Sequence, residues 1–212
     1  MNRNPERIHI RITQTVILLG FFFFLAENAF AQWVPGYSYK KRLTIDATQV
    51  CGAATLTNFP MLIQLSDTYL RTTGNGGLIS NPNGYDIIFT ASDGTTILNH
   101  QIDNYNGTTG SYTAWVNVPS LSPSTNTDIY MYYGNSSIVT NPSTAATWNA
   151  SFRTVYHFQN NNFNDGTANG FNSINNGTTS VTAKFGDGRN LDGISQWINT
   201  AYNELATANN FT

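Results

Sequence analysis

Short stretches that are apolar, or that alternate between apolar and polar residues, recur along the chain in the manner of β-strands with a buried face. In residues 39–46, for example, Leu43 and Ile45 fall on one face, while Arg42 and Thr44 fall on the other. Six such stretches precede residue 134: 39–46, 60–65, 85–91, 97–103, 112–118 and 128–133. Turns rich in glycine, asparagine and proline separate them, so the pattern predicts a β-sandwich domain over residues 37–137.

The pattern changes near Pro142, where residues 138–147 predict a linker with a short helix that has Pro142 in its first turn. One helical turn is also expected within residues 66–72. Strand-like stretches resume at 152–158, 181–185, 189–192 and 196–199. Residues 160–176 contain eight asparagines and predict a long surface loop, since they are too polar to form a core. Residues 210–212 resemble the start of another strand, so we expect the chain to be a fragment of a longer protein.

The N-terminal end has the three parts of a cleavable signal peptide. Residues 1–14 carry three arginines against one glutamate, residues 16–26 are an apolar run, and Ala29 and Ala31 form a small-x-small pattern. The alternative is a membrane anchor, but eleven residues span only about half of a roughly 30 Å hydrocarbon core. We therefore predict a signal peptide over residues 1–31, cleaved between Ala31 and Gln32, and an exported protein that is secreted or held at the cell surface.

Charge and cysteine content limit the partners of the mature chain. Removal of residues 1–31 takes away three of ten basic and two of twelve acidic residues, which leaves a net charge near −3. This surface has no basic footprint for nucleic acid, and no later stretch is apolar enough to span a membrane. Cys51 is the single cysteine, so an internal disulfide is excluded, and we expect this residue to be buried.

Five motifs carry a resemblance to a known family. They are LTNFPMLI at 56–63, DIIFT at 86–90, LNHQID at 98–103, WVNVP at 115–119 and IYMYYGN at 129–135. In order and spacing they resemble domain of unknown function 2341, over about residues 37–137. The resemblance implies an extracytoplasmic β-domain, and it assigns no chemistry.

A second resemblance concerns residues 148–212. Its carriers are VYHF at 155–158, Asp165, Gly170, FGDGRNLDG at 185–193, and the pair Trp197 and Ile198. These residues resemble the start of a concanavalin A-like, laminin-G-type jelly roll, of which about the first third is present. The fold expected from both resemblances is all-β: a β-sandwich domain followed by a truncated jelly roll.

Candidate catalytic groups are few. Glycosidases need a pair of carboxylates about 5–5.5 Å apart when they retain configuration. The only glutamate of the mature chain, Glu204, has no acid two residues away. Asp103 has no acid at positions 101 or 105, so we expect it to be a solvated residue at a strand end. We predict no catalytic residues, and hence a non-catalytic chain.

Metal ligands are equally scattered. His100, His157 and Cys51 are far apart in sequence, whereas zinc requires three or four ligands that converge. We expect His157 to be a hydrogen-bonded core histidine. Residues 187–192 carry Arg189 and Leu191 where a calcium loop needs oxygen ligands, so we read them as turns that flank a strand. We predict no metal site and no cofactor.

Aromatic residues are the remaining candidates for a ligand site. Trp115, Tyr130 and Tyr132 lie on two strands that are neighbours in sequence, where aromatic faces could stack on sugar rings; the alternative is that they fill the core. We predict an exported β-sandwich protein with a binding or adhesive role, its partner a glycan or another surface component. Two alternatives remain: an ancillary module of a polysaccharide-degrading enzyme, and a structural spacer.

Overall fold

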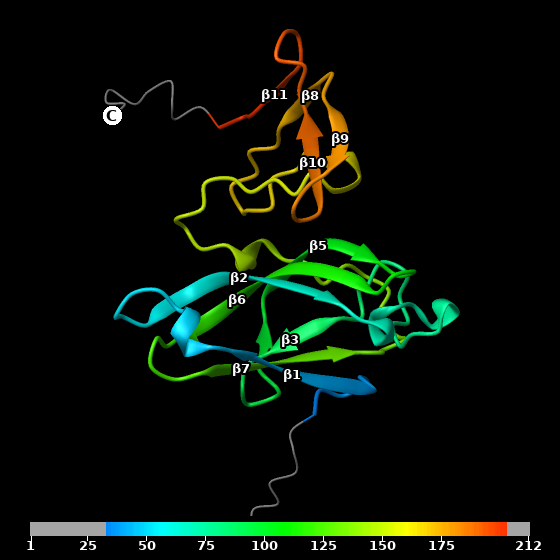
Figure 1. Cartoon of the computed structure of the whole chain (residues 1–212), viewed down its shortest axis with the longest axis vertical. Helices are drawn as coiled ribbons and strands as arrows, with labels where there is room; N and C mark the ends of the chain where they lie inside the picture. The colour runs from blue at the N-terminus through cyan, green and yellow to red at the C-terminus, as the bar shows by residue number, and fades with distance from the viewer. Residues whose placement is uncertain (1–32, 203–212) are drawn as a thin grey trace, which may run out of the picture. The chain divides into compact units, whose positions relative to one another are not determined.

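The computed structural model describes residues 33–202, which form an all-β structure (Figure 1). The predicted signal peptide and its cleavage site at Ala31 and Gln32 lie outside these residues. One sheet has the strand order β1-β7-β3-β4, and the other has the order β2-β6-β5, with every neighbouring pair antiparallel. The first sheet comprises β1 (Tyr39–Ile45), β7 (Thr127–Tyr133), β3 (Ile88–Thr90) and β4 (Ile97–Leu98). The second comprises β2 (Leu56–Ser66), β6 (Ser111–Leu121) and β5 (His100–Asn106).

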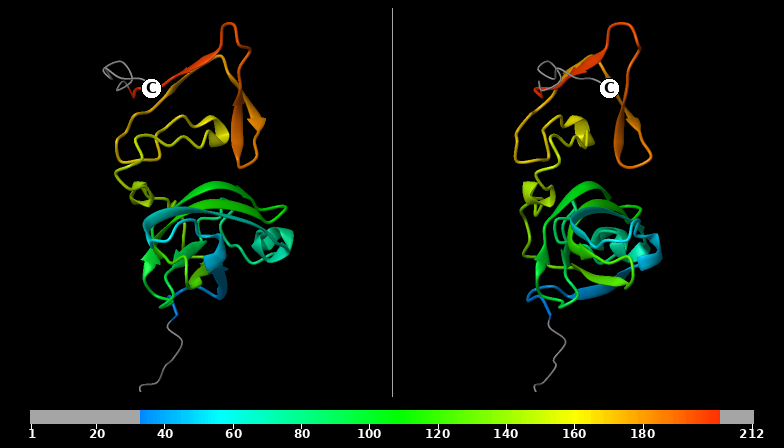
Figure 2. Two further views of the ribbon diagram at one scale, coloured as in Figure 1. Left: turned by 60° about the vertical axis from the view of Figure 1, so that its left-hand side comes forward. Right: turned by 90° about the vertical axis from the view of Figure 1, so that its left-hand side faces the viewer.

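The two sheets face each other and enclose one hydrophobic core (Figure 2). Ile129 and Met131 of β7 enter this core from one side, and Ala114 and Val116 of β6 enter it from the other. Alternation then turns the intervening residues of each strand outward. The β-sandwich predicted from the strand pattern is therefore confirmed.

All helical elements in the described residues are single 3-10 turns. They are η1 (Ala47–Gln49), η2 (Thr68–Leu70), η3 (Thr73–Asn75), η4 (Ala145–Thr147) and η5 (Gln159–Asn161). The turn expected within residues 66–72 is η2. The linker turn is η4, but it does not begin at Pro142: Thr144 is its N-cap, because the Thr144 hydroxyl accepts the N–H of Ala146 at 3.3 Å.

Residues 174–199 form two small antiparallel sheets of two strands each, which we together call the ribbon. Its strands are β8 (Ile174–Asn176), β9 (Thr179–Thr182), β10 (Asp187–Asn190) and β11 (Trp197–Asn199), with β9 paired to β10 and β8 paired to β11. Strands β9, β10 and β11 overlap the stretches predicted at 181–185, 189–192 and 196–199. The strand-like end at residues 210–212 lies outside the described residues.

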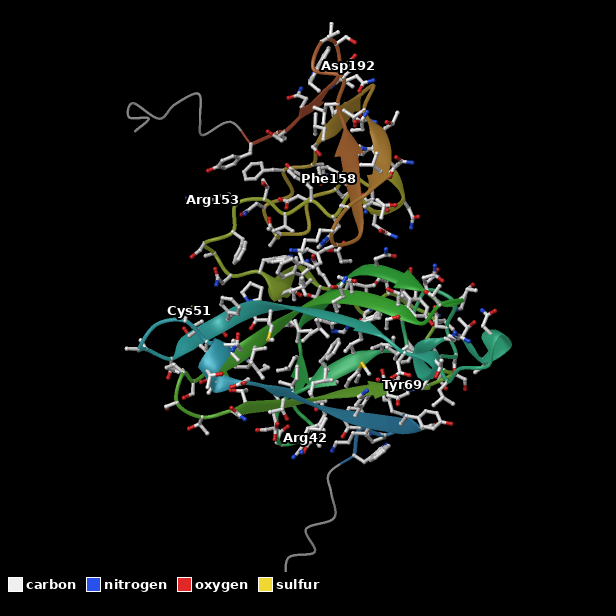
Figure 3. The ribbon with its side chains drawn as sticks, in the orientation of Figure 1. Arg42, Cys51, Tyr69, Arg153, Phe158 and Asp192 are labelled. Atoms are coloured by element: carbon white, nitrogen blue, oxygen red, sulfur yellow. The ribbon has the colours of Figure 1, made fainter. Side chains whose placement is uncertain are left out.

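Two further local predictions are wrong. Residues 152–158 form no strand; instead Asp165 accepts the N–H of Val155 at 3.0 Å, and Gly166 donates to the carbonyl of Val155 at 2.7 Å. Cys51 is exposed rather than buried, on the loop between η1 and β2 (Figure 3). Within residues 33–202, no helix has the length and apolar character needed to cross a membrane.

Candidate functional site

A polar cleft lies beside β5. It consists of a cavity of about 320 Å³ and a second of about 170 Å³, which share Ile102, Asn141, His157 and Asn162 in their walls. We call this pair of cavities the amide cleft, because eight of its sixteen lining residues carry an amide side chain. These amides are Asn83, Gln101, Asn104, Asn141, Gln159, Asn160, Asn162 and Asn164.

Strand β5 supplies the floor of the amide cleft. Its pairing with β6 is irregular between Ile102 and Asn104, where a β-bulge sets an extra residue in β5. Gln101 and Asp103 flank Ile102 on the side away from the core, and each is only 7% exposed because residues 144–166 cover them. At these two positions of β5, the outer face of the sheet is therefore a polar interface rather than a solvated surface.

Gln101 is the central residue of that interface. Its Nε2 donates to the carbonyls of Thr144 at 3.2 Å and Gly166 at 2.5 Å, and its Oε1 accepts the indole N–H of Trp148 at 2.7 Å. These bonds fix the amide orientation, since only the nitrogen can donate to two carbonyls. The side chain thereby ties a segment more than forty residues away to β5.

His157 lies between Gln101 and Asp103. Its Nε2 is 2.8 Å from Gln101 Oε1, which can only accept, so Nε2 carries a proton. Its Nδ1 is 3.4 Å from Asp103 Oδ2, which also accepts the indole N–H of Trp115 at 3.1 Å. Both ring nitrogens thus face groups of the wall, and Nε2 is not offered to a molecule in the cleft as a general base would be.

These contacts change two predictions. Asp103 is not a solvated residue at a strand end: it is buried, with Trp115 and His157 as partners. His157 is hydrogen-bonded as expected, but it belongs to coil and lines the cleft. The sequence analysis missed Gln101, although it lies within the quoted motif LNHQID.

Aromatic rings pack behind the wall. The ring of Trp148 is 5.4 Å from that of Trp115, 5.1 Å from that of Phe152 and 6.1 Å from that of His157, measured between centroids. Trp115, predicted as a sugar-stacking residue, is therefore covered in part by Trp148 and held by Asp103.

The structure does not bring Trp115 together with the other two predicted aromatics. Tyr130 and Tyr132 lie on β7, which belongs to the other sheet. Tyr132 is fully buried and donates its hydroxyl proton to the carbonyl of Gly94 at 2.8 Å. The ammonium group of Lys40 lies 4.0 Å from the ring centroid of Tyr130, so this ring already holds a cation of the chain itself.

The loop at residues 157–162 forms one wall of the cleft and has an unusual backbone. Phe158, Asn160 and Asn161 have φ angles of 56°, 52° and 59°, in the left-handed region that side chains other than glycine rarely occupy. The ribbon holds this conformation from outside the cleft. Asp187 accepts the N–H of Asn160 at 3.1 Å, and Arg189 donates to the side-chain oxygen of Asn161 at 2.7 Å.

Asp165 organises the opposite end of the cleft. One carboxylate oxygen accepts the backbone N–H groups of Val155 and Thr167, and the other accepts the hydroxyl of Thr167 and the N–H of Phe171. Partial burial acts to raise the pKa of Asp165, but these hydrogen bonds outweigh it and hold the pKa below its usual value. Asp165 is therefore ionised at neutral pH.

The charges of the cleft are few and of one sign. Asp103 and Asp165 are its carboxylates, and no lysine or arginine lines either cavity. In the part of the chain that the structure describes, no three His, Cys, Asp or Glu side chains gather as metal ligands would. The arrangement offers many neutral donors and acceptors and no countercharge for an anion.

Comparison with known proteins gave one match. Residues 83–172 match the family model described as Domain of unknown function (DUF2341), which confirms the predicted resemblance for this stretch. The match starts later than residue 37 and continues past residue 137; the jelly-roll resemblance received no family match. No curated protein and no solved structure matched the chain. Residues 83–172 are thus similar to a domain of unknown function, and they contain every residue that lines the amide cleft.

Proposed function

We propose that the protein is an exported, non-catalytic binding protein whose amide cleft takes an uncharged, polyhydroxylated ligand such as a segment of a glycan. The signal-peptide pattern in residues 1–31 supports export. Attachment to a glycan or another surface component would give the chain an adhesive role.

The amide lining is the observation that supports this ligand class. A carboxamide carries two donors and two acceptor sites in one planar group, which matches a hydroxyl that both donates and accepts. Tyr85 and Tyr105 add flat apolar surface to the same cavity. Anionic ligands usually bind where arginine or lysine pairs with them, and neither residue lines the cleft.

The cleft also has a size suited to a small ligand. Its larger cavity, of about 320 Å³, lies at the lower end of the range of roughly 300–1,000 Å³ that is typical of ligand pockets. The family match points to the same stretch of chain, because it covers the cleft from Asn83 to Gly166.

A glycan array followed by titration calorimetry on the mature chain tests this proposal. We expect binding to a neutral glycan, and an affinity at least tenfold lower for Asn83→Leu, whose exposed side chain lines the cleft. The control is Asn190→Leu, an exposed asparagine of β10 outside the cleft, which should bind like the parent.

Three results would contradict the proposal. Absence of binding to every neutral glycan would favour the spacer alternative. Binding restricted to anionic glycans would contradict the charge argument. An equal loss in Asn83→Leu and Asn190→Leu would place the ligand elsewhere.

A further inference from the structure

Residues 157–162, which we call the wall loop, carry cleft-lining side chains on a strained backbone. Four of its residues line the larger cavity of the amide cleft: His157, Gln159, Asn160 and Asn162. Phe158, Asn160 and Asn161 have left-handed φ angles, which asparagine tolerates better than phenylalanine does. Such a backbone persists only where its surroundings hold it, and it is found most often at functional sites.

The wall loop is held at consecutive residues from two sides. On the side of β5, Gln159 donates from Nε2 to the side-chain oxygen of Asn104 at 3.2 Å. On the side of the ribbon, Asp187 of β10 accepts the backbone N–H of Asn160 at 3.1 Å. Because the second bond reaches the main chain, it acts directly on one of the strained residues.

Arg189 of the same strand supplies a second hold, and it is itself anchored. Its Nε donates to the hydroxyl of Thr178 at 3.0 Å, and its Nη2 donates to the carbonyl of Thr178 at 2.6 Å. The guanidinium also lies 4.9 Å from the ring centroid of Phe163. Its remaining nitrogen, Nη1, donates to the side-chain oxygen of Asn161 at 2.7 Å. A planar group oriented in this way has little freedom left to lose when it binds the loop.

The two ribbon residues act from outside the cleft. Neither Asp187 nor Arg189 lines either cavity, so neither is placed to contact a ligand there. Asn160 and Asn162, by contrast, are exposed residues of the cavity wall that a ligand can reach. The ribbon therefore determines the backbone from which these two amides project.

We infer that Asp187 and Arg189 are positioning residues, through which the ribbon keeps the wall loop in the conformation that binds ligand. The inference rests on the proposed function and adds control of the cleft by a separate part of the chain. If only this loop conformation binds, the apparent affinity falls with the fraction of molecules that adopt it. Ligand must in turn stabilise the held loop, because such coupling is reciprocal.

Amide hydrogen exchange followed by NMR tests the hold without any ligand. The reporter is the amide of Asn162, which donates to the carbonyl of Gln159 at 2.9 Å and touches neither ribbon residue. A hydrogen bond to a charged group changes an equilibrium constant by roughly ten- to hundredfold, and the lower end applies at an exposed loop. We expect the Asn162 amide to exchange about tenfold faster in Asp187→Ala and in Arg189→Met.

Two control variants are matched to these. Asp187→Asn keeps a side-chain oxygen that can accept the N–H of Asn160, so exchange at Asn162 should stay within about threefold of the parent. Lys184→Met removes a positive charge from the turn between β9 and β10 and should leave exchange at Asn162 unchanged.

Titration with cellotetraose, xylotetraose and mannotetraose, with NMR line-shape analysis, measures the effect on binding. The double variant Asp187→Ala/Arg189→Met should bind at least about tenfold more weakly than the parent, with a dissociation rate within about twofold. The rate is kept because the conformation that binds is the same and only its population falls. Loss of a direct ligand contact would instead raise the dissociation rate. Saturating sugar should also restore slow exchange at Asn162 in both single variants.

The remaining outcomes each overturn a stated part. If the parent binds none of these sugars and no array glycan, the proposed function and this inference fail together. If the parent binds and the double variant binds equally well, the inference alone fails, and unchanged exchange at Asn162 in both single variants has the same meaning. A faster dissociation rate would make the ribbon residues ligand contacts. Exchange that rises as much throughout β9 and β10 as in the wall loop would show a structural role only.

Discussion

Replacement of Gln101 by methionine should weaken the docking of residues 144–167, the segment that covers Gln101 on β5. Methionine has a similar length and fills the same space, but it cannot make the four contacts of the amide. Those contacts reach Thr144, Trp148, His157 and Gly166, so one substitution cuts every side-chain hydrogen bond between Gln101 and the covering segment.

The expected loss follows from the number of contacts and from burial. A hydrogen bond within a protein contributes about 0.5–1.5 kcal/mol net, so four contribute roughly 2–6 kcal/mol. Gln101 is 7% exposed, and the indole N–H of Trp148 would remain buried without an acceptor. We therefore expect the free energy for docking of residues 144–167 to fall by about 4 kcal/mol.

Hydrogen exchange measures this loss residue by residue. A change of about 4 kcal/mol should speed amide exchange in residues 148–167 by roughly 1,000-fold, while amides of core strand β7 should keep their protection. Gln64→Met, on exposed β2, is the matched control and should shift neither region. The reasoning is refuted if exchange in residues 148–167 of Gln101→Met stays within about fivefold of the parent.

Two further predictions concern stability. Burial lowers the pKa of His100, so below about pH 6.5 the unfolded chain takes up a proton that the folded chain does not. Unfolding free energy should therefore fall as pH drops from 7.5 to 5.5, by up to about 1.4 kcal/mol per pH unit, and His100→Gln should have a shallower slope in urea titrations; identical slopes would contradict this. Gly110→Ala should lose about 2 kcal/mol or more in the same assay, because φ is +78° and the new Cβ would lie 2.0 Å from the carbonyl oxygen of Asp67; an unchanged midpoint would contradict it.

Local patterns were sufficient to predict the sandwich, because a strand that is buried on one face alternates apolar and polar residues along the sequence. The stretch at residues 39–46 became β1, and that at residues 128–133 became β7, with almost the predicted bounds. The stretch at residues 85–91 shortened to Ile88–Thr90. Its first residues turn instead, since Asp86 accepts the backbone N–H groups of Ser80 and Asn81.

The same local patterns failed where the backbone bonds to side chains. Residues 152–158 contain good strand formers, but the backbone of Val155 is taken by Asp165 and Gly166, and no neighbouring strand is needed. The prediction that Asp103 is solvated depended on the lack of an acid at positions 101 and 105. Its partner in the structure is His157, which lies 54 residues away in sequence.

The candidate site was the least predictable part of the molecule. The asparagine-rich residues 160–176 predicted a surface loop, and part of that loop is in fact a wall of the amide cleft. Side chains with no charge and no metal affinity leave no chemical motif, so Gln101 and Gln159 are recognised only from their contacts. The predicted aromatic set failed to converge for a related reason: strands that are neighbours in sequence belong here to different sheets.

The pairing of β1 with β7 sets an order for folding. Tyr39 pairs with Tyr133, so the first strand of the sandwich cannot pair with its neighbour until the last strand, β7, has left the ribosome. β3 also depends on β7, whereas β5 and β6 form a local hairpin. Contacts so distant in sequence slow folding, and an unpaired strand is prone to aggregate in the meantime. Strand β1 carries three consecutive positive charges, at Lys40, Lys41 and Arg42. Their repulsion should keep nascent chains from associating through unpaired β1 before β7 is available to pair with it.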